Sequence, residues 1–328
     1  SAAMVAGDVQ TITVTAYDLY GNIATGYTGD KAITFSGANT SPNPATAPTC
    51  RDKNSADIGF GSATTITFAA GAGSSLMKLY KVETAHIQAA DGLITTSGAD
   101  ELAAAVSVSA KNKLLWVTQP SSPVTAGAVW TPFSIEITDA YGNRRTDADV
   151  VTVIPSSGTL GGTTGQAAAA GLATFDNITR EATGALTLYG SSISLASTVA
   201  SGIVTVEASS ASYFKVTGSG AMAAGGSQTI TVTAYDQYGN VATGYAGAKT
   251  ITFEGASISP NPATAPTCND INFGNATSVT FASGVGTSEM KLYKMETGHI
   301  KATDGSLTTS DSNDLDVAVA AGSKNKLL

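Results

Sequence analysis

The chain has 328 residues, of which 42% are hydrophobic and only 13% are charged, against about 25% charged residues in an average soluble protein. The low Glu, Lys and Arg content excludes a coiled coil, and a formal charge of −8 argues against nucleic-acid binding, which depends on clustered Lys and Arg. No stretch approaches the roughly 18 apolar residues that a membrane-spanning helix needs, so no membrane span is expected. Low charge with abundant Thr, Ser, Gly and Val favours an all-β extracellular protein.

The beginning of the chain returns near its end. Gln10–Cys50 is identical to Gln228–Cys268 at 33 of 41 positions, and Ser62–Lys113 is identical to Asn275–Lys326 at 29 of 52 positions. A different unit lies between the two copies, so the order is A, B, A. We call the three units A1, B and A2.

Each unit has the length of a typical single domain. We predict that A1 spans residues 1–109 and lacks its first strand, that B spans 110–211, and that A2 spans 212–322. Residues 323–328 would begin a further strand.

Alternation of Thr with apolar residues predicts strands with one buried face, because successive strand side chains point to opposite faces. In chain order, the expected strands are Thr11–Tyr17, Ala32–Phe35, Ala63–Phe68, Leu76–Val82 and His86–Ala90 in A1, Phe133–Thr138, Val150–Ile154, Leu172–Phe175, Ala185–Tyr189 and Ile203–Val206 in B, and Thr229–Tyr235 and Thr250–Phe253 in A2. Short strands at this spacing, without a helical period, indicate antiparallel sandwiches.

An Asp-x-Tyr-Gly-Asn motif follows the alternating strand of every unit, at Asp18–Asn22, Asp139–Asn143 and Asp236–Asn240. Gly and Asn tolerate the positive φ of a tight turn, so we expect turns stabilised by the Asp side chain. Calcium takes six to eight oxygen ligands, and one Asp with one Asn supplies too few. No cofactor is therefore expected, and calcium at the junctions between domains is the alternative.

These residues resemble a known family. A strand ending in Thr-Val-Thr-Ala-Tyr-Asp, followed by Tyr-Gly-Asn and Thr-Ile-Thr-Phe, resembles the bacterial immunoglobulin-like repeats of invasin/intimin-type adhesins and surface-layer proteins. Unit B resembles them further through Ser156–Leu160, Gly171–Phe175 and Gly184–Leu188. The resemblance implies three tandem Ig-like antiparallel β-sandwich domains, placed outside the cell or at its surface. It implies spacers, stalks and building blocks of lattices or filaments, with ligand binding at only some tips.

The sequence shows no catalytic constellation. His86 and His299 are the two histidines and occupy equivalent positions, so neither a His-His metal site nor a Ser-His-Asp triad can form within one domain. Phosphate-binding and hydrolase motifs are also absent from the sequence. We therefore predict that the protein is not an enzyme.

The two cysteines, Cys50 and Cys268, end equivalent Pro-rich segments, Ser41–Cys50 and Ser259–Cys268. One cysteine per unit excludes a disulfide within a unit. A free buried thiol and an intermolecular disulfide in an assembly both remain open. The Pro-rich segments are either rigid surface loops or elements that dock subunits against each other.

Three asparagines, Asn39, Asn177 and Asn275, lie in Asn-x-Ser/Thr sequons and would accept glycans in a competent host. None of these sequons recurs in the other A copy, which favours chance occurrence in a Thr-rich chain.

The ends of the units differ. A2 opens with Ser212–Gly218 and B with Lys111–Val117, which both have the pattern of a first strand, whereas A1 starts without one. The chain ends in Lys324, Asn325, Lys326, Leu327 and Leu328, which repeat Lys111–Leu115.

Two explanations fit these ends. The chain is a piece of a longer A-B-A-B protein, or the tail of one subunit fills the vacant sheet edge of A1 in the next subunit. The second arrangement would generate an open filament. The first is favoured, because the tail copies the opening of B rather than that of A.

The sequence thus predicts a non-enzymatic extracellular protein that forms a surface layer, filament or stalk. Its partner would be itself, as a homopolymer, or further repeats of the same chain. The alternative is an adhesin that binds carbohydrate or a host protein through loops.

Overall fold

The computed structural model describes residues 3–92, 94–96, 98–193 and 195–323, with the backbone alone for 196–198. The chain there is β-structure throughout, apart from two short 3₁₀ helices, η1 (Gly98–Asp100) and η2 (Asp311–Asn313). The expected all-β, Ig-like fold class is confirmed. The predicted strand at Lys324–Leu328 lies outside the described residues.

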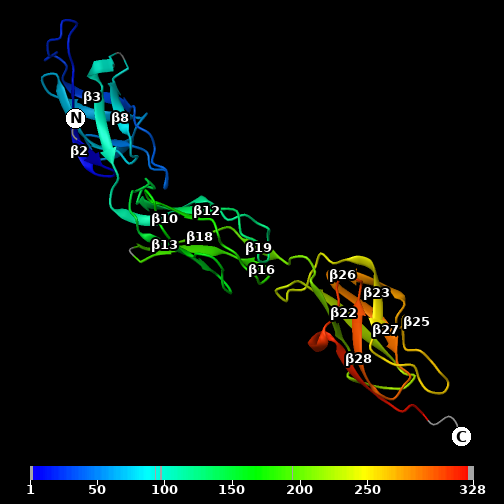
Figure 1. The fold of residues 1–328 in the computed structure, drawn as a ribbon. Coiled ribbons are helices and arrows are strands. Elements are labelled where there is room, and N and C mark those ends of the chain that lie inside the picture. Colours follow the sequence, from blue (N-terminus) through cyan, green and yellow to red (C-terminus); the bar gives the residue numbers. More distant parts are fainter. Residues whose placement is uncertain (1–2, 93, 97, 194, 324–328) are drawn as a thin grey trace.

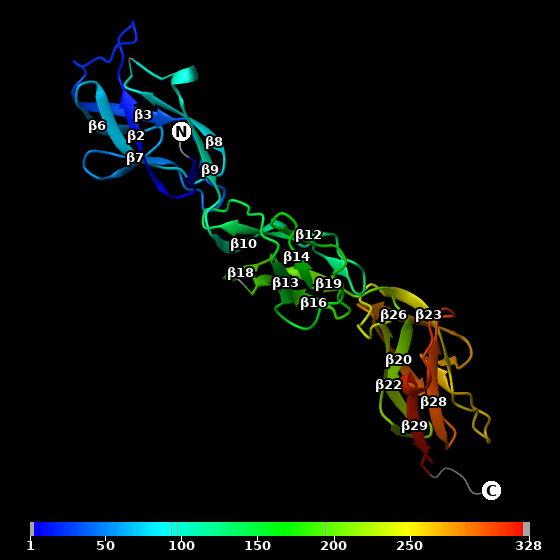
Figure 2. The same cartoon turned by 60° about the vertical axis from the view of Figure 1, so that its left-hand side comes forward.

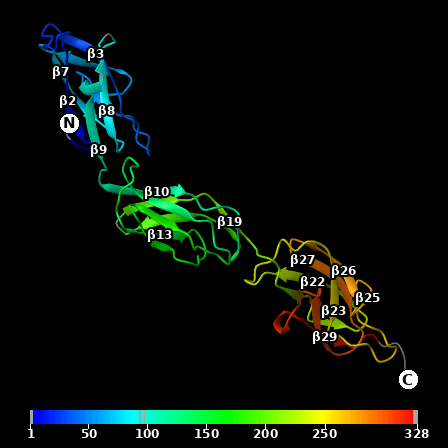
Figure 3. The ribbon, with the colours of Figure 1, turned by 45° about the horizontal axis from the view of Figure 1, so that its top comes forward.

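The buried hydrophobic side chains form three separate clusters, one each in A1, B and A2. The figures show three lobes in a row, A1, B and A2 in chain order (Figures 1 and 2). Strand β9 of A1 leads directly into β10 of B across the first junction (Figure 3).

A1 consists of two facing sheets. Its strands are β1 (Met4–Val5), β2 (Val9–Thr15), β3 (Gly29–Ser36), β4 (Thr49–Arg51), β5 (Asp57–Gly59), β6 (Ala63–Phe68), β7 (Ala72–Lys78), β8 (Thr84–Ala90) and β9 (Leu102–Ser107). One sheet has the order β1-β9-β8-β3-β6 and the other β2-β7-β4-β5. Alternate side chains of β3 and β6, among them Phe35 and Phe68, are buried between the sheets, as their period-two pattern requires.

B consists of three smaller sheets. Its strands are β10 (Lys111–Thr118), β11 (Val124–Thr125), β12 (Phe133–Asp139), β13 (Val150–Pro155), β14 (Gly165–Ala167), β15 (Leu172–Phe175), β16 (Gly184–Leu186), β17 (Leu188–Ser192), β18 (Leu195–Ala200) and β19 (Val204–Glu207). The orders are β10-β12-β15, β11-β19-β16 and β14-β13-β17-β18. Both tryptophans, Trp116 and Trp130, pack in the core of B.

A2 repeats the strands of A1 and adds one at its start. Its strands are β20 (Tyr213–Thr217), β21 (Ala221–Ala223), β22 (Ser227–Tyr235), β23 (Gly247–Glu254), β24 (Thr267–Cys268), β25 (Ile271–Asn272), β26 (Ala276–Ala282), β27 (Val285–Lys291), β28 (Thr297–Thr303) and β29 (Leu315–Ala320). They form one continuous folded sheet with the order β20-β22-β27-β26-β23-β28-β29-β21, and β24 pairs with β25 and β27.

Two expected strands differ from those observed. The strand expected at Leu76–Val82 is β7, Ala72–Lys78, which ends before the backbone that meets unit B. The single strand expected at Ala185–Tyr189 is divided into β16 and β17 at Thr187. Its two parts belong to different sheets, a division that alternation along one strand cannot reveal.

The core of B offers a selective stability test. Phe133 is buried and contacts the rings of Trp116 and Trp130 at centroid distances of 5.8 and 6.4 Å. We expect Phe133→Ala to lower the free energy of unfolding of B by about 3–5 kcal/mol, through lost burial and a residual cavity. Because both tryptophans lie in B, denaturation followed by tryptophan fluorescence measures this unit. Exposed Ile154→Ala is the control, and an equal loss there would contradict the assignment of the core.

Candidate assembly sites

Each Asp-x-Tyr-Gly-Asn motif forms a turn organised by its aspartate. In unit B, the Asp139 carboxylate accepts the backbone N–H groups of Tyr141 and Asn143 at 2.9 Å each, and Gly142 has a φ of 81°. The same bonds form at 2.8–2.9 Å in A1 and at 2.9 Å in A2. These are the expected side-chain-stabilised turns, and we call them docking turns because of the contacts that follow.

The docking turn of B holds the end of A1. The Asn143 side chain donates to Tyr80 O at 2.8 Å and accepts from Val82 N at 2.9 Å. The Tyr141 ring packs on the Tyr80 ring at 4.9 Å and joins the core cluster of A1. A Cβ on Gly7 would lie 2.1 Å from the Tyr141 hydroxyl, so only glycine allows this approach.

The linker and the Pro-rich segment of A1 complete this junction. The second oxygen of the Asp139 carboxylate accepts the N–H of linker residue Ser109 at 3.1 Å. Asn43 uses its backbone alone: its N–H donates to Tyr141 O at 3.0 Å, and its carbonyl accepts from Lys113 Nζ at 2.6 Å. The Pro-rich loop of A1 thus contacts the next unit within the chain.

The junction between B and A2 repeats the contacts of the docking turn, though not those of the Pro-rich loop. Asn240 donates to Glu181 O at 2.7 Å and accepts from Thr183 N at 3.1 Å. Tyr238 packs against the core cluster of B, and a Cβ on Gly127 would lie 1.9 Å from its hydroxyl. Asp236 again accepts a linker N–H, from Ser209 at 3.0 Å.

We call the surface that receives a docking turn the acceptor end. It consists of a glycine at positive φ, a backbone carbonyl and a backbone N–H: Gly7, Tyr80 O and Val82 N in A1, and Gly127, Glu181 O and Thr183 N in B. Sequence reasoning missed these residues, although the dipeptides Ala6-Gly7, Ala126-Gly127 and Ala224-Gly225 recur at one place in every unit.

The docking turn of A1 has the same internal bonds but faces solvent. Leu19 is 92% exposed and Tyr20 86%, whereas Asp139 and Asp236 are fully buried. The side-chain and backbone hydrogen bonds from Asn22 hold the pKa of Asp18 below its ordinary value. The turn therefore has the docking conformation without a neighbouring unit.

A second candidate site runs along β2. In A2, β22 pairs with both β20 and β27, but β2 pairs with β7 alone within the described part of the chain. A groove of about 790 Å³ lies beside it; its lining is mixed, with polar side chains such as Gln88 and Thr96 beside the apolar Ile12, Val14 and Phe68.

The same position in A2 shows what fits such a groove. There Phe214 of β20 is fully buried against the rings of Tyr245 and Phe281, at 5.5 and 6.0 Å. The corresponding residues in A1, Tyr27 and Phe68, already form the same edge-to-face pair at 4.9 Å. The groove is thus preformed for an apolar side chain on an added strand.

A half-buried tyrosine, Tyr27, fixes one wall of the groove. Tyr27 donates to Asp91 Oδ2 at 2.6 Å, and Tyr245 donates in the same way to Asp304 at 2.6 Å. Burial, with the hydrogen bond to Asp91, raises the pKa of Tyr27 to about 12. The ring therefore stays neutral and in place at physiological pH.

Cys50 and Cys268 are free and fully buried, in β4 and β24. Burial raises the pKa of each thiol to about 12, against a smaller opposite effect of the neighbouring Ser75 or Ser288 hydroxyl. An intermolecular disulfide would first require the sheet over the sulfur to open.

The remaining candidates lie on the surface. The ring of His299 contacts Asp316 at 2.5 Å, and His86 lies 3.7 Å from Glu101. The sequon residues Asn39, Asn177 and Asn275 are all exposed. Calcium remains a prediction, although among the described residues no three His, Cys, Asp or Glu side chains gather as a metal site.

This chain is similar to known proteins only among solved structures. No protein-family model and no curated protein sequence matches it. Similar solved structures include invasin, a bacterial integrin-binding protein (14% identity, TM-score 0.35, 96% of this chain and 60% of that one) and the Escherichia coli adhesin FdeC (19%, 0.38, 96% and 93%). Domains 4–9 of the surface-layer protein SbsC also match (16%, 0.24, 94% and 42%).

These are the kinds of protein that the sequence motifs resemble. The chain spans about 60% of the invasin chain. Because every one of these TM-scores lies below 0.5, we base the function on this chain's own contacts. Within the described residues, none of the helices is long and apolar enough to cross a membrane.

The buried thiols give a test by chemical labelling. A thiol reagent reacts with the thiolate, and a pKa of about 12 leaves very little thiolate at pH 8. We expect Cys50 and Cys268 to label only on unfolding, whereas a cysteine introduced by Leu19→Cys labels at once in the native protein. Rapid labelling of both native cysteines at pH 8, detected by mass spectrometry, would contradict their burial.

Proposed function

We propose that this chain is a structural segment of an extracellular, cell-surface assembly, in which sandwich domains are held in a row as a stalk, filament or layer element. The observation that carries the proposal is the repeated junction. Two junctions between different kinds of unit use the same docking turn, the same two asparagine hydrogen bonds and the same glycine.

Each junction resists bending for a physical reason. Only residues 108–110 separate β9 from β10, and the N–H of Ser109 is held by the Asp139 carboxylate. Swinging B away from A1 would break the two hydrogen bonds of Asn143 and expose the ring of Tyr141. A hydrogen bond contributes about 1 kcal/mol net, and an unsatisfied buried partner costs more. The contacts therefore stiffen the chain.

The adhesin alternative would need an exposed surface suited to a ligand. Trp116 and Trp130 do not provide one, because both pack in the core of B. Leu19 and Tyr20 are exposed at the tip of A1, but the equivalent tyrosines of B and A2 are covered by the preceding units. Their position favours contact with another sandwich domain over contact with a glycan.

Strand exchange is the second element of the proposal. The groove along β2 would accept an added strand. In A2, Phe214 lies opposite Ala234, so an apolar residue of the added strand would lie opposite Ala16, the counterpart of Ala234 in A1. Leu327 would take this position, because Lys324–Leu328 repeats Lys111–Leu115 in sequence and Leu114 is buried in β10. Backbone hydrogen bonds to the open edge of β2 would supply the remaining affinity.

The rod is tested by substituting one asparagine. Asn143→Ala leaves Tyr80 O and Val82 N without partners, so we expect B to lose about 1–3 kcal/mol of stability and the junction to become flexible. Small-angle X-ray scattering would show a broader distribution of interparticle distances. Asn22→Ala is the matched control, since it removes the same bonds within a turn but none between units. Equal flexibility in both variants would argue against a rigid rod.

The groove is tested by supplying the strand within the chain. Ser219 is the counterpart of Ser1, so a copy of residues 212–218 fused before Ser1 would place a strand beside β2. We expect slower amide hydrogen exchange in Val9–Thr15 and a higher melting temperature of A1. The same graft with its Phe214 counterpart changed to Asp should have neither effect. If both grafts behave alike, the groove does not accept a strand.

A further inference from the structure

We infer that the far end of A2 binds the docking turn of A1 in a second copy of this chain, so that copies join end to end through a third junction of the same kind. The inference rests on the proposed structural function and deepens it by naming the surfaces that meet. Both surfaces, Asp18–Asn22 and the far end of A2, are uncovered among the described residues.

The far end of A2 has the backbone of an acceptor end. The N–H of Gly225 donates to Leu292 O at 2.8 Å, as that of Gly7 donates to Leu79 O at 2.8 Å and that of Gly127 to Arg180 O at 2.8 Å. The three glycines have φ values of 82°, 88° and 76°. This correspondence makes Tyr293 O and Met295 N the counterparts of Tyr80 O and Val82 N. The described residues provide no hydrogen bond to either of these two atoms.

Gly225 is open where the other two glycines are covered. A Cβ built on Gly7 or Gly127 would collide with a tyrosine hydroxyl, but one built on Gly225 meets nothing within 4 Å. A glycine at positive φ explains the local turn, and the open space above it leaves room for the tyrosine that the other units receive.

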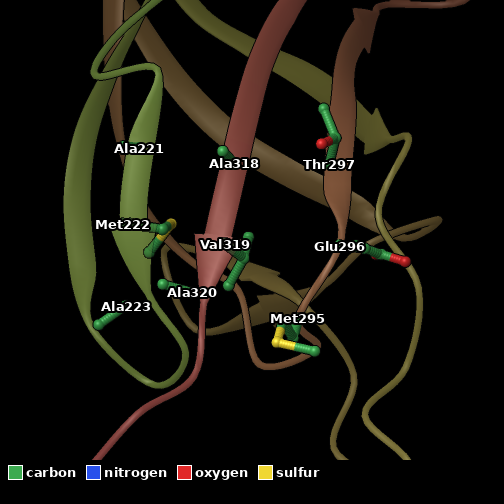
Figure 4. A pocket seen from close by; sticks show the side chains of 9 residues that line it. All are labelled: Ala221, Met222, Ala223, Met295, Glu296, Thr297, Ala318, Val319 and Ala320. Carbon is green, nitrogen blue, oxygen red and sulfur yellow. The ribbon is translucent and has the colours of Figure 1, made fainter.

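Apolar surface surrounds this acceptor end. Met295 is 70% exposed, and beside it lies a shallow hollow of about 680 Å³ between β21, β29 and the start of β28. Figure 4 shows Met295 at the end of the unit, below Val319 and Ala320. A flexible methionine adapts to an incoming ring, so this surface suits the side chain of Tyr20.

The two existing junctions indicate that the turn of A1 can dock on the acceptor end of A2, although both belong to A units. The type A turn, Asp236–Asn240, docks on B, and the type A acceptor end of A1 receives the turn of B. The asparagine amide donates to a backbone carbonyl at both junctions. Tyr80 and Glu181 can therefore serve equally despite their different side chains. Pairing a type A turn with a type A end therefore needs no new contact.

A second copy is the occupant we assign, because the two surfaces complement each other: the exposed turn of A1 has the hydrogen bonds of a docking turn, and Gly225 has the open space that its tyrosine would fill. Such contact is heterologous, since the two surfaces differ, and it builds an open filament wherever the rotation between successive copies does not close a ring. The chain that follows β29 of the first copy would then approach the docking turn of the second copy, just as the linker residues Ser109 and Ser209 approach the docking turns of B and A2. The Gly322 N–H, counterpart of that of Ser109, would face the Asp18 carboxylate.

The proposed junction between copies can be tested by cross-linking at positions that leave the docking contacts unchanged. Asn43 and Ala140 meet at the first junction, where Lys113 Nζ binds both carbonyls, at 2.6 and 3.2 Å. Their counterparts are Asn261 and Leu19. The full chain with Leu19→Cys and Asn261→Cys, treated with a short bis-maleimide, should give a ladder of dimers and higher oligomers. Without a tether the contact is weak, so protein should be raised to about 1 mM, the range of effective concentrations that short linkers provide.

Three controls make the result decisive. The chain with Asn43→Cys and Ala140→Cys should cross-link within one molecule, which verifies the geometry. Replacing Asn261→Cys by Thr159→Cys, on the exposed surface of B, should abolish the ladder. Adding Asn22→Ala to the Leu19→Cys, Asn261→Cys chain should lower the ladder yield roughly tenfold or more, whereas Asn143→Ala should not.

The inference is overturned if the intramolecular control cross-links but no ladder appears, or if Asn22→Ala leaves the ladder unchanged. A ladder with the Thr159→Cys pair as strong as with Asn261→Cys also overturns it. The experiment is then repeated on the chain with the strand grafted before Ser1, which fills the groove along β2 and prevents strand exchange. A ladder that persists in this chain supports the junction independently of strand exchange. The rod itself is judged separately, by scattering from single chains at low concentration.

Discussion

The arrangement of this protein depends on one carboxylate in each docking turn. Asp139 uses one oxygen to fix the backbone of its own turn and the other to hold the linker that enters the domain. Buried carboxylates are costly unless they are fully hydrogen-bonded, and this one accepts backbone and amide donors from both directions. The turn and the linker are therefore fixed together, and the domain cannot turn about its linker independently.

The asparagine carries this rigidity across the junction. Its amide has both a donor and an acceptor, and at each junction it bonds to a carbonyl and an N–H that lie two residues apart on the neighbouring unit. The tyrosine covers these bonds from one side, and the glycine beneath it removes the Cβ that would hold the ring away. Each residue of the motif thus has a separate task, which accounts for its recurrence in units that otherwise differ.

The sequence predicts the fold class well, because alternation in strands such as Thr11–Tyr17 reports a buried face directly. It also locates the docking turns, but it cannot show that Asn143 bonds to Tyr80 O, since backbone acceptors leave no side-chain signature. The end of β7 differs from the prediction for the same reason: Leu79 and Tyr80 continue an apolar pattern, but Leu79 O accepts from Gly7 N within A1 and Tyr80 O accepts from Asn143 of B. The sequence predicts the open edge beside β2 from the missing first strand, but it cannot show that Tyr27 and Phe68 already form an edge-to-face pair there.

An acceptor end made of backbone atoms has a consequence for how such chains vary. Side chains at Tyr80 and Glu181, or at Val82 and Thr183, differ freely while the same two bonds form. Units can therefore diverge in their loops and surfaces, as A and B have, and still join through the same contacts. What cannot vary is the glycine, whose replacement would displace the tyrosine, together with the Asp, Tyr and Asn of the turn. The junction thus constrains the glycine and the turn residues, and it places no demand on the side chains of their backbone partners.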